Sequence, residues 1–397
     1  MTRLSTLPAQ RRKPYGPVGV LGVESTPFSK PFHGSDGNFT DTIASSPLEH
    51  IATRYRFPRE LSGEGECIGI LSFGGAISPS DLNLYFCQQN RTWPDIQFPV
   101  ASCTNRPNLN SKYDREIALD IQVASTLAPG AKIVVYLASN DEAGWVDALT
   151  RAIHDQENQP SVLSISWGAT EDSWSADAMQ AATHLLRQAA NLGITICAAS
   201  GDDGCARDLH GNCRVTFPAS SPYVLACGGT IIAADDREVV WNIRNKSASG
   251  GGISDRIPRP DWQPSLSSIL THGFPCRRNS GFDGRQIPDV SGPASSYSVY
   301  VGGRYQNGAG GTSAVAPLWS ALIARLNQGL RSRGFGPVGY FHPRLYRNPP
   351  VQKTFCDVTS GHNDPFGRNG YEARRGWDAC TGWGTPNGQL LLEALCS

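Results

Sequence analysis

The sequence lacks the features that mark several classes of protein. It carries 35 Lys and Arg against 35 Asp and Glu, so the formal net charge is zero and there is no basic footprint for nucleic acid. No window approaches the roughly 20 apolar residues that a membrane-spanning helix needs. Residues 1–14 are polar and basic and contain no apolar core of a secretory signal. These absences predict no nucleic-acid partner, no membrane partner and no visible signal peptide.

The 11 cysteines and eight histidines also form no metal-binding pattern. No Cys-x-x-Cys pair or Cys/His cluster has the spacing of a zinc site. Cys205 and Cys213 flank a short loop and are either a local disulfide or two separate thiols. No histidine stands in a Gly-His-Gly or Gly-His-Thr context, where an imidazole base for a serine nucleophile would be expected.

Short apolar segments alternate with helix-like segments along most of the chain. Strands are expected at 67–73, 131–137, 162–167, 194–199 and 224–227, and helices at 48–55, 81–89, 116–127, 141–153, 175–192 and from 388 to the end. This alternation predicts an α/β fold with a doubly wound, mostly parallel sheet flanked by helices, and functional groups at the carboxyl ends of strands. Residues 1–45 lack the pattern and read as a poorly ordered leader or remnant of a pro-region, with one domain from 46 to 397.

The most distinctive string is Gly-Gly-Thr-Ser-Ala-Val-Ala-Pro at 310–317, followed by apolar residues at helical spacing to Leu326. Two glycines allow a close backbone approach before the helix. Ser313 then lies near a helix amino terminus, where free N–H groups favour developing negative charge. Ser313 is therefore a candidate nucleophile, and the alternative is that Thr312 or Ser313 only caps the helix.

An acidic pair takes the place of the missing histidine. Glu116 and Asp120 are four residues apart, so both carboxyl groups lie on one face of a helix. If exposed, they would repel by roughly 0.2–0.5 kcal/mol; if buried, they would share a proton and one pKa would rise. A carboxylate with a raised pKa can act as a general base. The alternative is a solvated acidic face with Arg115 as counter-ion.

A third acid, Asp202, follows the strand at 194–199 in the string Ser-Gly-Asp-Asp-Gly. A protonated carboxyl group at a strand end could donate a hydrogen bond to an oxyanion. A local Asx turn is the alternative.

With these pieces in place, the chain resembles the sedolisin family of serine-carboxyl peptidases, and within it the kumamolisin branch. The resemblance covers about residues 46–395, and the strings that carry it lie at 116–121, 127–133, 164–174, 217–223, 226–230, 310–317 and 376–382. It implies a subtilisin-like fold in a single catalytic domain and a monomeric endopeptidase that hydrolyses protein or peptide substrates at acidic pH. It also implies an extracellular or otherwise acidic location.

The resemblance assigns roles to individual residues. Ser313 would be the nucleophile, Glu116 the general base, Asp120 the group that orients Glu116, and Asp202 the acid of the oxyanion hole. The backbone of Ser166, Trp167 and Gly168 would pair with an extended substrate. One structural Ca²⁺ would be held by the side chains of Asp357 and Asp378 and the backbone oxygens of Val358, Arg374 and Gly376.

Three departures from the family pattern stand out. Ser72 occupies a first-strand position where kumamolisin-type enzymes carry Glu, and this predicts a shorter acidic network. Thr216 replaces an acid that helps to favour basic side chains in the substrate. Only some 45 residues precede the catalytic region, where family precursors carry a long folded prodomain.

Two other functions remain as alternatives. Tripeptidyl-peptidases share these motifs, and a non-catalytic binding protein could use the same scaffold. A histidine-dependent subtilisin is disfavoured because no histidine has the required context.

Overall fold

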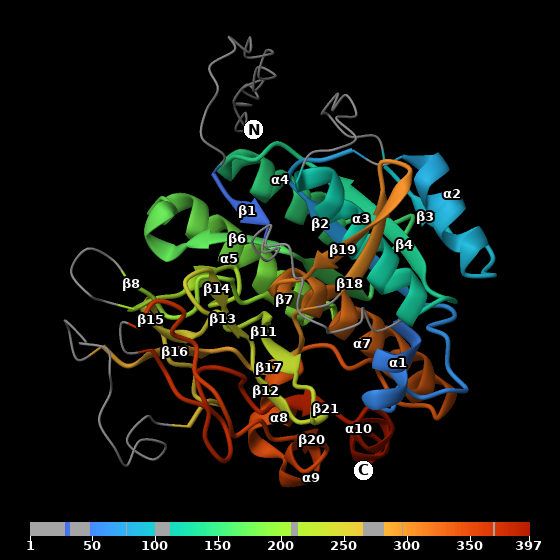
Figure 1. Ribbon diagram of the computed structural model, residues 1–397. Coiled ribbons are helices and arrows are strands. Elements are labelled where there is room, and N and C mark those ends of the chain that lie inside the picture. Colours follow the sequence, from blue (N-terminus) through green and yellow to red (C-terminus); the bar gives the residue numbers. More distant parts are fainter. Residues whose placement is uncertain are drawn as a thin grey trace, which may run out of the picture.

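The computed structural model describes residues 28–31, 48–76, 78–99, 112–207, 213–264, 282–295, 297–367 and 370–397 (Figure 1). Of the expected leader at 1–45, only residues 28–31 lie within these ranges. Side chains at 31, 206, 207 and 213 are outside the description as well.

A mostly parallel sheet forms the centre of the molecule, as predicted. Its strands follow the order β12-β11-β7-β5-β2-β4-β3, with β17 also paired to β11. All pairs are parallel except β11 with β12. The bounds are β2 (Cys67–Ser72), β3 (Ile96–Gln97), β4 (Lys132–Leu137), β5 (Val162–Ile165), β7 (Thr195–Ala199), β11 (Leu225–Ile232), β12 (Glu238–Val240) and β17 (Val290–Pro293).

Helices cover both faces of this sheet because its strands are apolar on both sides. Along β4, Ile133 and Val135 pack in one hydrophobic cluster with α3 and α7, whereas Val134 and Tyr136 pack in a second with α4 and α5. This is the two-residue alternation of a strand. The helices are α1 (Leu48–Arg54), α2 (Pro79–Gln88), α3 (Lys112–Leu127), α4 (Glu142–Ile153), α5 (Ala176–Asn191), α7 (Val315–Ser332), α8 (His342–Arg347), α9 (Pro349–Gln352) and α10 (Gly388–Leu395).

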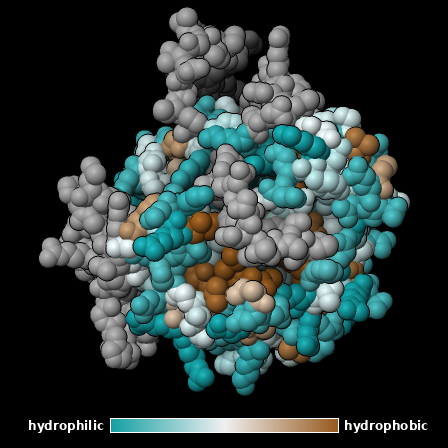
Figure 2. All heavy atoms as spheres, in the orientation of Figure 1, coloured by the Kyte–Doolittle hydropathy of each residue, from teal (hydrophilic) through white to brown (hydrophobic). Residues whose placement is uncertain are grey.

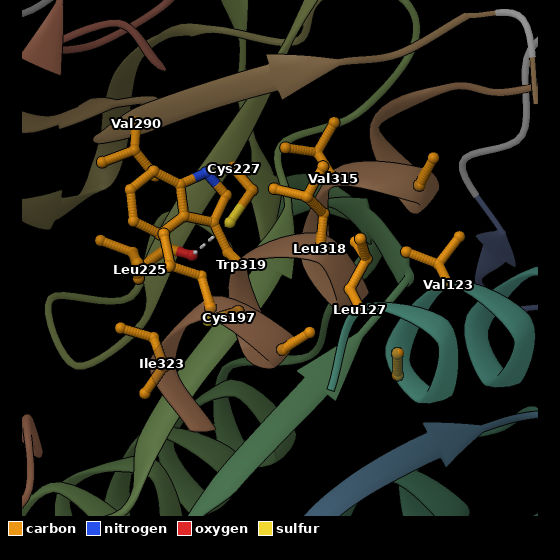
Figure 3. Close-up of a cluster of buried hydrophobic side chains, with 14 of the residues drawn as sticks. Val123, Leu127, Cys197, Leu225, Cys227, Val290, Val315, Leu318, Trp319 and Ile323 are labelled. Carbon is orange, nitrogen blue, oxygen red and sulfur yellow. Dashed lines mark hydrogen bonds between the residues drawn. The ribbon is translucent and has the colours of Figure 1, made fainter. Parts of the chain in front are cut away.

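Helix α7 is largely buried, with 14 of its 18 residues in the interior. Its Trp319 is fully buried among Cys197 of β7, Leu225 and Cys227 of β11 and Val290 of β17 (Figure 3). The indole N–H donates to the Ser291 carbonyl at 3.0 Å. Burying a large apolar side chain contributes about 1.5–3 kcal/mol, so the packing of α7 fixes the position of the turn that precedes it. That turn, η2 (Thr312–Ala314), carries Ser313.

The glycines before η2 behave as the sequence predicts. A Cβ on Gly310 would lie 2.4 Å from the Ala294 carbonyl oxygen. Gly311 has φ of +89° and its N–H donates to the same oxygen at 2.7 Å. Only glycine tolerates the close approach at position 310 and the positive φ at position 311 without strain.

Some elements differ from expectation. Helix α3 begins at Lys112, and the expected strand at 162–167 breaks at Ser166 into β5 and β6 (Trp167–Thr170), because the two halves pair with different neighbours. Cys205 is disulfide-bonded, so the free-thiol alternative is wrong for this residue. The short strands and turns outside the main sheet are β1 (Lys30–Pro31), β8 (Ala206–Arg207), β9 (Cys213–Arg214), β10 (Thr216–Phe217), β13 (Asn242–Ile243), β14 (Ser247–Ala248), β15 (Gly252–Pro258), β16 (Gly284–Ile287), β18 (Tyr297–Val301), β19 (Arg304–Ala309), β20 (Phe355–Cys356), β21 (Thr385–Pro386) and η1 (Glu171–Ser173).

None of the helices in the described part of the chain is both long enough and apolar enough to span a bilayer. On the face shown in Figure 2, hydrophobic side chains gather near the middle and hydrophilic ones surround them.

Candidate active site

Ser313 lies where η2 meets α3 and the segment between β5 and β6. It is fully buried in η2, and its hydroxyl donates to the Ser166 carbonyl at 3.2 Å. The Ser166 hydroxyl in turn donates to the Ser313 carbonyl at 3.1 Å. The alternative that Thr312 or Ser313 only caps the helix is wrong. Neither η2 nor α7 has a side-chain cap, and the Thr312 hydroxyl donates to Asp202 instead. The serine is thus held in place and its hydroxyl is not committed to the helix.

The acidic pair on α3 is buried next to this serine. Glu116 and Asp120 are 1% and 0% exposed, so the alternative of a solvated acidic face is wrong. Asp120 Oδ1 accepts the Ser166 hydroxyl at 2.5 Å. The Ser313 hydroxyl has a second acceptor within reach in the Glu116 carboxyl group. Ser166 therefore connects the pair to the backbone of the turn that carries Ser313.

Burial dominates the electrostatics of the pair. Desolvation raises the pKa of Glu116 well above its usual range, and the Asp120 charge raises it further, while the Ser313 hydrogen bond opposes the shift. Desolvation also raises the pKa of Asp120 to about 8, against the hydrogen bond from Ser166. Two neighbouring carboxylates cannot both ionise cheaply in a dry site. The pair therefore retains a proton at neutral pH.

Asp202 approaches from the carboxyl end of β7. Its Oδ1 accepts both the Thr312 N–H and the Thr312 hydroxyl at 2.9 Å, so the local Asx turn is not what holds it. Its Oδ2 is buried and has no hydrogen-bond partner among the described residues. Desolvation raises the pKa of Asp202 to about 7, although both Thr312 hydrogen bonds lower it. Below that pH the carboxyl group is neutral and can donate a hydrogen bond, and its Oδ2 has no partner among the described residues.

Comparison with known proteins shows which family the chain belongs to. The subtilase family model matches residues 100–340. Kumamolisin from Bacillus sp. (strain MN-32) is 42% identical over 399 residues, which cover 95% of this chain and 70% of that protein. The tripeptidyl-peptidase sed5 from Aspergillus fumigatus is 30% identical over 386 residues, 87% of this chain and 64% of that one.

A solved structure is similar as well. Pseudomonas sedolisin, a serine-carboxyl proteinase complexed with pseudo-iodotyrostatin, aligns with a TM-score of 0.74 and 28% identity over 89% of this chain and 98% of that one. This chain belongs to the sedolisin family. The predicted subtilisin-like fold in a single domain is confirmed by the same comparison.

In this sedolisin-family chain the expected substrate strand already has a neighbour. Strand β6 pairs antiparallel with β1 on one side, Gly168 opposite Lys30 and Trp167 opposite Pro31. Ser166 lies directly before β6 and next to Ser313. The three predicted residues therefore form one continuous edge that leads to the candidate nucleophile.

Ser72 shows what the departure on the first strand does. Its buried hydroxyl donates to the Gly74 carbonyl at 2.9 Å. The Trp167 indole N–H has no hydrogen-bond partner within the described ranges. No carboxylate at position 72 therefore extends the acidic cluster toward this tryptophan.

Two hydrogen bonds link four of the five predicted calcium ligands near the end of the chain. The Gly376 N–H donates to Asp357 Oδ2 at 2.8 Å, and the Arg374 N–H donates to Asp378 Oδ2 at 2.9 Å. The described residues include no group of three or more His, Cys, Asp or Glu side chains suited to a metal. A cation here would thus rely on backbone oxygens as well as the two carboxylates, a donor set that fits Ca²⁺.

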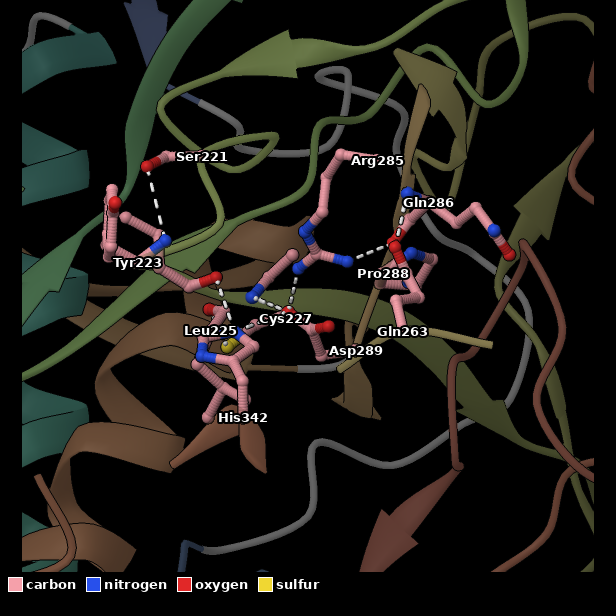
Figure 4. Close-up of polar contacts among 12 residues, drawn as sticks. Ser221, Tyr223, Leu225, Cys227, Gln263, Arg285, Gln286, Pro288, Asp289 and His342 are labelled. Carbon is pink, nitrogen blue, oxygen red and sulfur yellow. Dashed lines mark hydrogen bonds and ion pairs between the residues drawn. The ribbon is translucent and has the colours of Figure 1, made fainter. Parts of the chain in front are cut away.

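A buried polar network surrounds the Asp289 carboxylate next to the central sheet. Arg285 and His342 both point toward the Asp289 carboxylate, just before β17 (Figure 4). The Tyr346 hydroxyl and the Ala226 N–H donate to the same group at 2.7 and 2.8 Å. Burial alone would raise the pKa of Asp289, but the Arg285 and His342 charges hold it well below its usual range.

The sequence did not reveal the two hydroxyl groups that connect these acids. Ser166 bridges to Asp120, and Thr312 bridges to Asp202 from 110 residues away. Both lie in strings that carry the family resemblance, but neither hydroxyl has a local signal for its distant partner.

Proposed function

We propose that this chain is a serine-type endopeptidase that hydrolyses peptide bonds at acidic pH. One observation carries the proposal: a buried serine lies between a buried pair of acids and a third buried acid, and all three acids have raised pKa values. Membership of the sedolisin family supports it, since the similar proteins named above are peptidases.

In the proposed reaction, Ser313 Oγ attacks the peptide carbonyl carbon and its proton passes to Glu116. Glu116 then gives that proton to the leaving amine as the C–N bond breaks, which leaves an acyl group on Ser313. Water hydrolyses the ester by the same route in reverse. Asp120 keeps the shared proton and orients Glu116, and such a positioned base contributes about 10²–10⁴ in rate.

Asp202 stabilises the oxyanion in this scheme. The carbonyl oxygen gains negative charge during attack, and a protonated Asp202 Oδ2 donates a hydrogen bond to it. Its hydrogen bonds to Thr312 fix the carboxyl group relative to Ser313. A preorganised donor of this kind lowers the activation barrier by about 2.7–4 kcal/mol. The donor is lost when Asp202 ionises, so the proposed activity belongs to acidic pH.

We further propose one structural Ca²⁺ held by the side chains of Asp357 and Asp378 and the carbonyl oxygens of Val358, Arg374 and Gly376. When bound, the ion would neutralise two carboxylates and tie two loop segments together. Asp378 is 4% exposed, and an acid this deeply buried favours a counter-ion. The ion has no part in the reaction described above.

The test is cleavage of an acid-denatured protein at pH 3–7, with analysis of the products by mass spectrometry. The wild-type chain is expected to yield internal fragments, and Ser313→Ala, which keeps the fold but has no nucleophile, is expected to yield none. A ladder of tripeptides from the amino terminus would assign the tripeptidyl-peptidase alternative, which the similarity to sed5 supports. A folded wild-type chain without any cleavage would favour the binding-protein alternative.

A further inference from the structure

Residues 28–31 lie along β6 in the manner of a bound peptide. Lys30 pairs with Gly168 and Pro31 with Trp167 in antiparallel register. Antiparallel addition to a strand edge is a common mode of peptide recognition. The segment runs from amino to carboxyl end toward Ser166, whose carbonyl accepts the Ser313 hydroxyl.

The register relates this segment to the cleaved bond. A substrate in the same register has one residue opposite Gly168, the next opposite Trp167, and the third opposite Ser166, beside the nucleophile. The residue opposite Gly168 is therefore the third on the amino-terminal side of the bond that Ser313 attacks. Lys30 occupies this position in the structure.

Each described side chain of the segment has a partner in the catalytic region. The Phe28 ring packs edge-on against Trp174 at 4.8 Å. Ser29 is 2% exposed; its N–H and hydroxyl donate to Asn140 Oδ1 at 2.9 and 2.7 Å, and its carbonyl accepts from Asn140 Nδ2 at 2.8 Å. The catalytic region thus contacts both the backbone and the side chains of the segment.

Lys30 has an ionic partner. Its Nζ lies 2.5 Å from Asp203 Oδ2, and both side chains are about half exposed. Asp203 directly follows Asp202, so its place relative to Ser313 is fixed by the hydrogen bonds of its neighbour to Thr312. A carboxylate at this point can receive any cationic side chain that a substrate presents opposite Gly168.

On the basis of the proposed function, we propose that Asp203 makes this peptidase prefer Lys or Arg as the third residue before the cleaved bond. A substrate would replace residues 28–31 on β6 and present its basic side chain to Asp203 in place of Lys30. In this proposal the basic preference comes from Asp203 and does not require the acid that Thr216 replaces.

The size of the preference follows from exposure. Half-exposed ion pairs are weak and are screened by salt. We therefore expect kcat/KM to be about three- to five-fold higher for Lys than for Gln at this position at low ionic strength, and the ratio to fall toward one in 0.5 M NaCl.

The experiment uses the full chain and three quenched fluorescent peptides that differ only at this position, with Lys, Gln or Glu. Their amino termini are acetylated, so that no α-ammonium group competes for Asp203. The ratio of kcat/KM values within one variant cancels any general loss of activity. Asp203→Asn should bring the Lys/Gln ratio to one, and Asp203→Lys should favour Glu over Lys.

Asp172→Asn is the matched control, because this acid lies just past the other end of β6 and pairs with Arg214 and Arg256. It should retain the Lys preference. Equal rates for Lys and Gln in the wild-type chain would overturn the inference even if the Asp203 variants do not fold, and so would an undiminished ratio in Asp203→Asn. Cleavage with no preference defeats this inference alone, whereas absence of cleavage of every peptide defeats the proposed function and this inference with it.

Discussion

Asp202 and Asp203 are adjacent residues of one type with opposite environments. Asp202 is 6% exposed and its pKa is raised to about 7 by burial. Asp203 is about half exposed and is paired with Lys30. In the proposed function, these surroundings would make Asp202 a neutral hydrogen-bond donor and Asp203 a charged receptor, as in other sites where two acids take different roles.

Substitution of Asp202 separates its donor function from its ionisation. Asp202→Asn keeps a donor and an acceptor that can still face Thr312, so we expect reduced but measurable cleavage. Because an amide does not titrate, this cleavage should not show the fall near pH 7 that ionisation of Asp202 causes in the wild-type chain. Asp202→Ala removes the donor and should lower kcat by about 10²–10³. Steady-state rates from pH 3 to 8 check both. Equal rates for Asp202→Ala and wild type would exclude a role in the oxyanion hole.

At the same scale, the sequence identified the acids and the serine but not their connections. The strings around Glu116, Asp202 and Ser313 predicted which residues to consider. The hydroxyls of Ser166 and Thr312 could not be assigned partners, because their hydrogen bonds form only after α3, β7 and η2 pack together. Those bonds span 46 and 110 residues, and no local pattern encodes them.

At the scale of elements, periodicity predicted most helices and the long strands. The central strands are buried on both faces, and their apolar runs marked them clearly. The break at Ser166 was missed because it depends on pairing: β5 joins the main sheet, while β6 pairs with β1 and β10. Strand β1 was missed because two residues in a polar leader carry no periodicity.

The Asp289 network gives a prediction at this scale. Asp289→Asn would leave the fully buried Arg285 without its counter-charge, and breaking a buried pair in this way costs about 3–5 kcal/mol. We expect the free energy of unfolding in urea to fall by that amount in a Ser313→Ala background. The control is Asp261→Asn, which removes an exposed pair with Arg347 and should change stability by less than about 0.5 kcal/mol. A fall as small as that of the control would show that the network does not stabilise β17.

For the whole molecule, the buried acids couple stability to pH. Asp120 and Asp202 have pKa values of about 8 and about 7 in the folded chain, against ordinary values near 4. Between about pH 4 and pH 7, both carboxyl groups stay protonated in the folded chain but release their protons in the unfolded chain. The free energy of unfolding therefore falls as pH rises through this range. Each group contributes a slope of about 1.4 kcal/mol per pH unit.

This dependence can be measured by urea unfolding at pH 5 and pH 7 with constant ionic strength, again in Ser313→Ala. The unfolding free energy should be larger at pH 5. Adding Glu116→Gln, Asp120→Asn and Asp202→Asn should flatten the difference, since amides do not titrate. A protein more stable at pH 7 than at pH 5 would contradict the assigned pKa directions.

The proposed calcium site gives a second test for the whole molecule. Excess chelator should lower the melting temperature by several degrees, because an ion at 100 times its Kd stabilises the folded chain by about 2.7 kcal/mol. Differential scanning calorimetry with calcium and with chelator measures the shift. Asp357→Asn should melt alike in both conditions. A wild-type melting temperature that chelator leaves unchanged would contradict the proposed calcium site.

The central claim is that a carboxyl pair, rather than an imidazole, accepts the proton of Ser313. The most direct test is the pH dependence of kcat/KM on an acid-denatured protein, for the wild-type chain and for Glu116→Gln. We predict wild-type activity that is highest in acid and declines toward neutral pH, and Glu116→Gln rates at least 10²-fold lower at every pH. Glu116→Gln turnover close to wild type, or wild-type activity that increases as pH rises through about 6.5, the ordinary pKa of histidine, would contradict it.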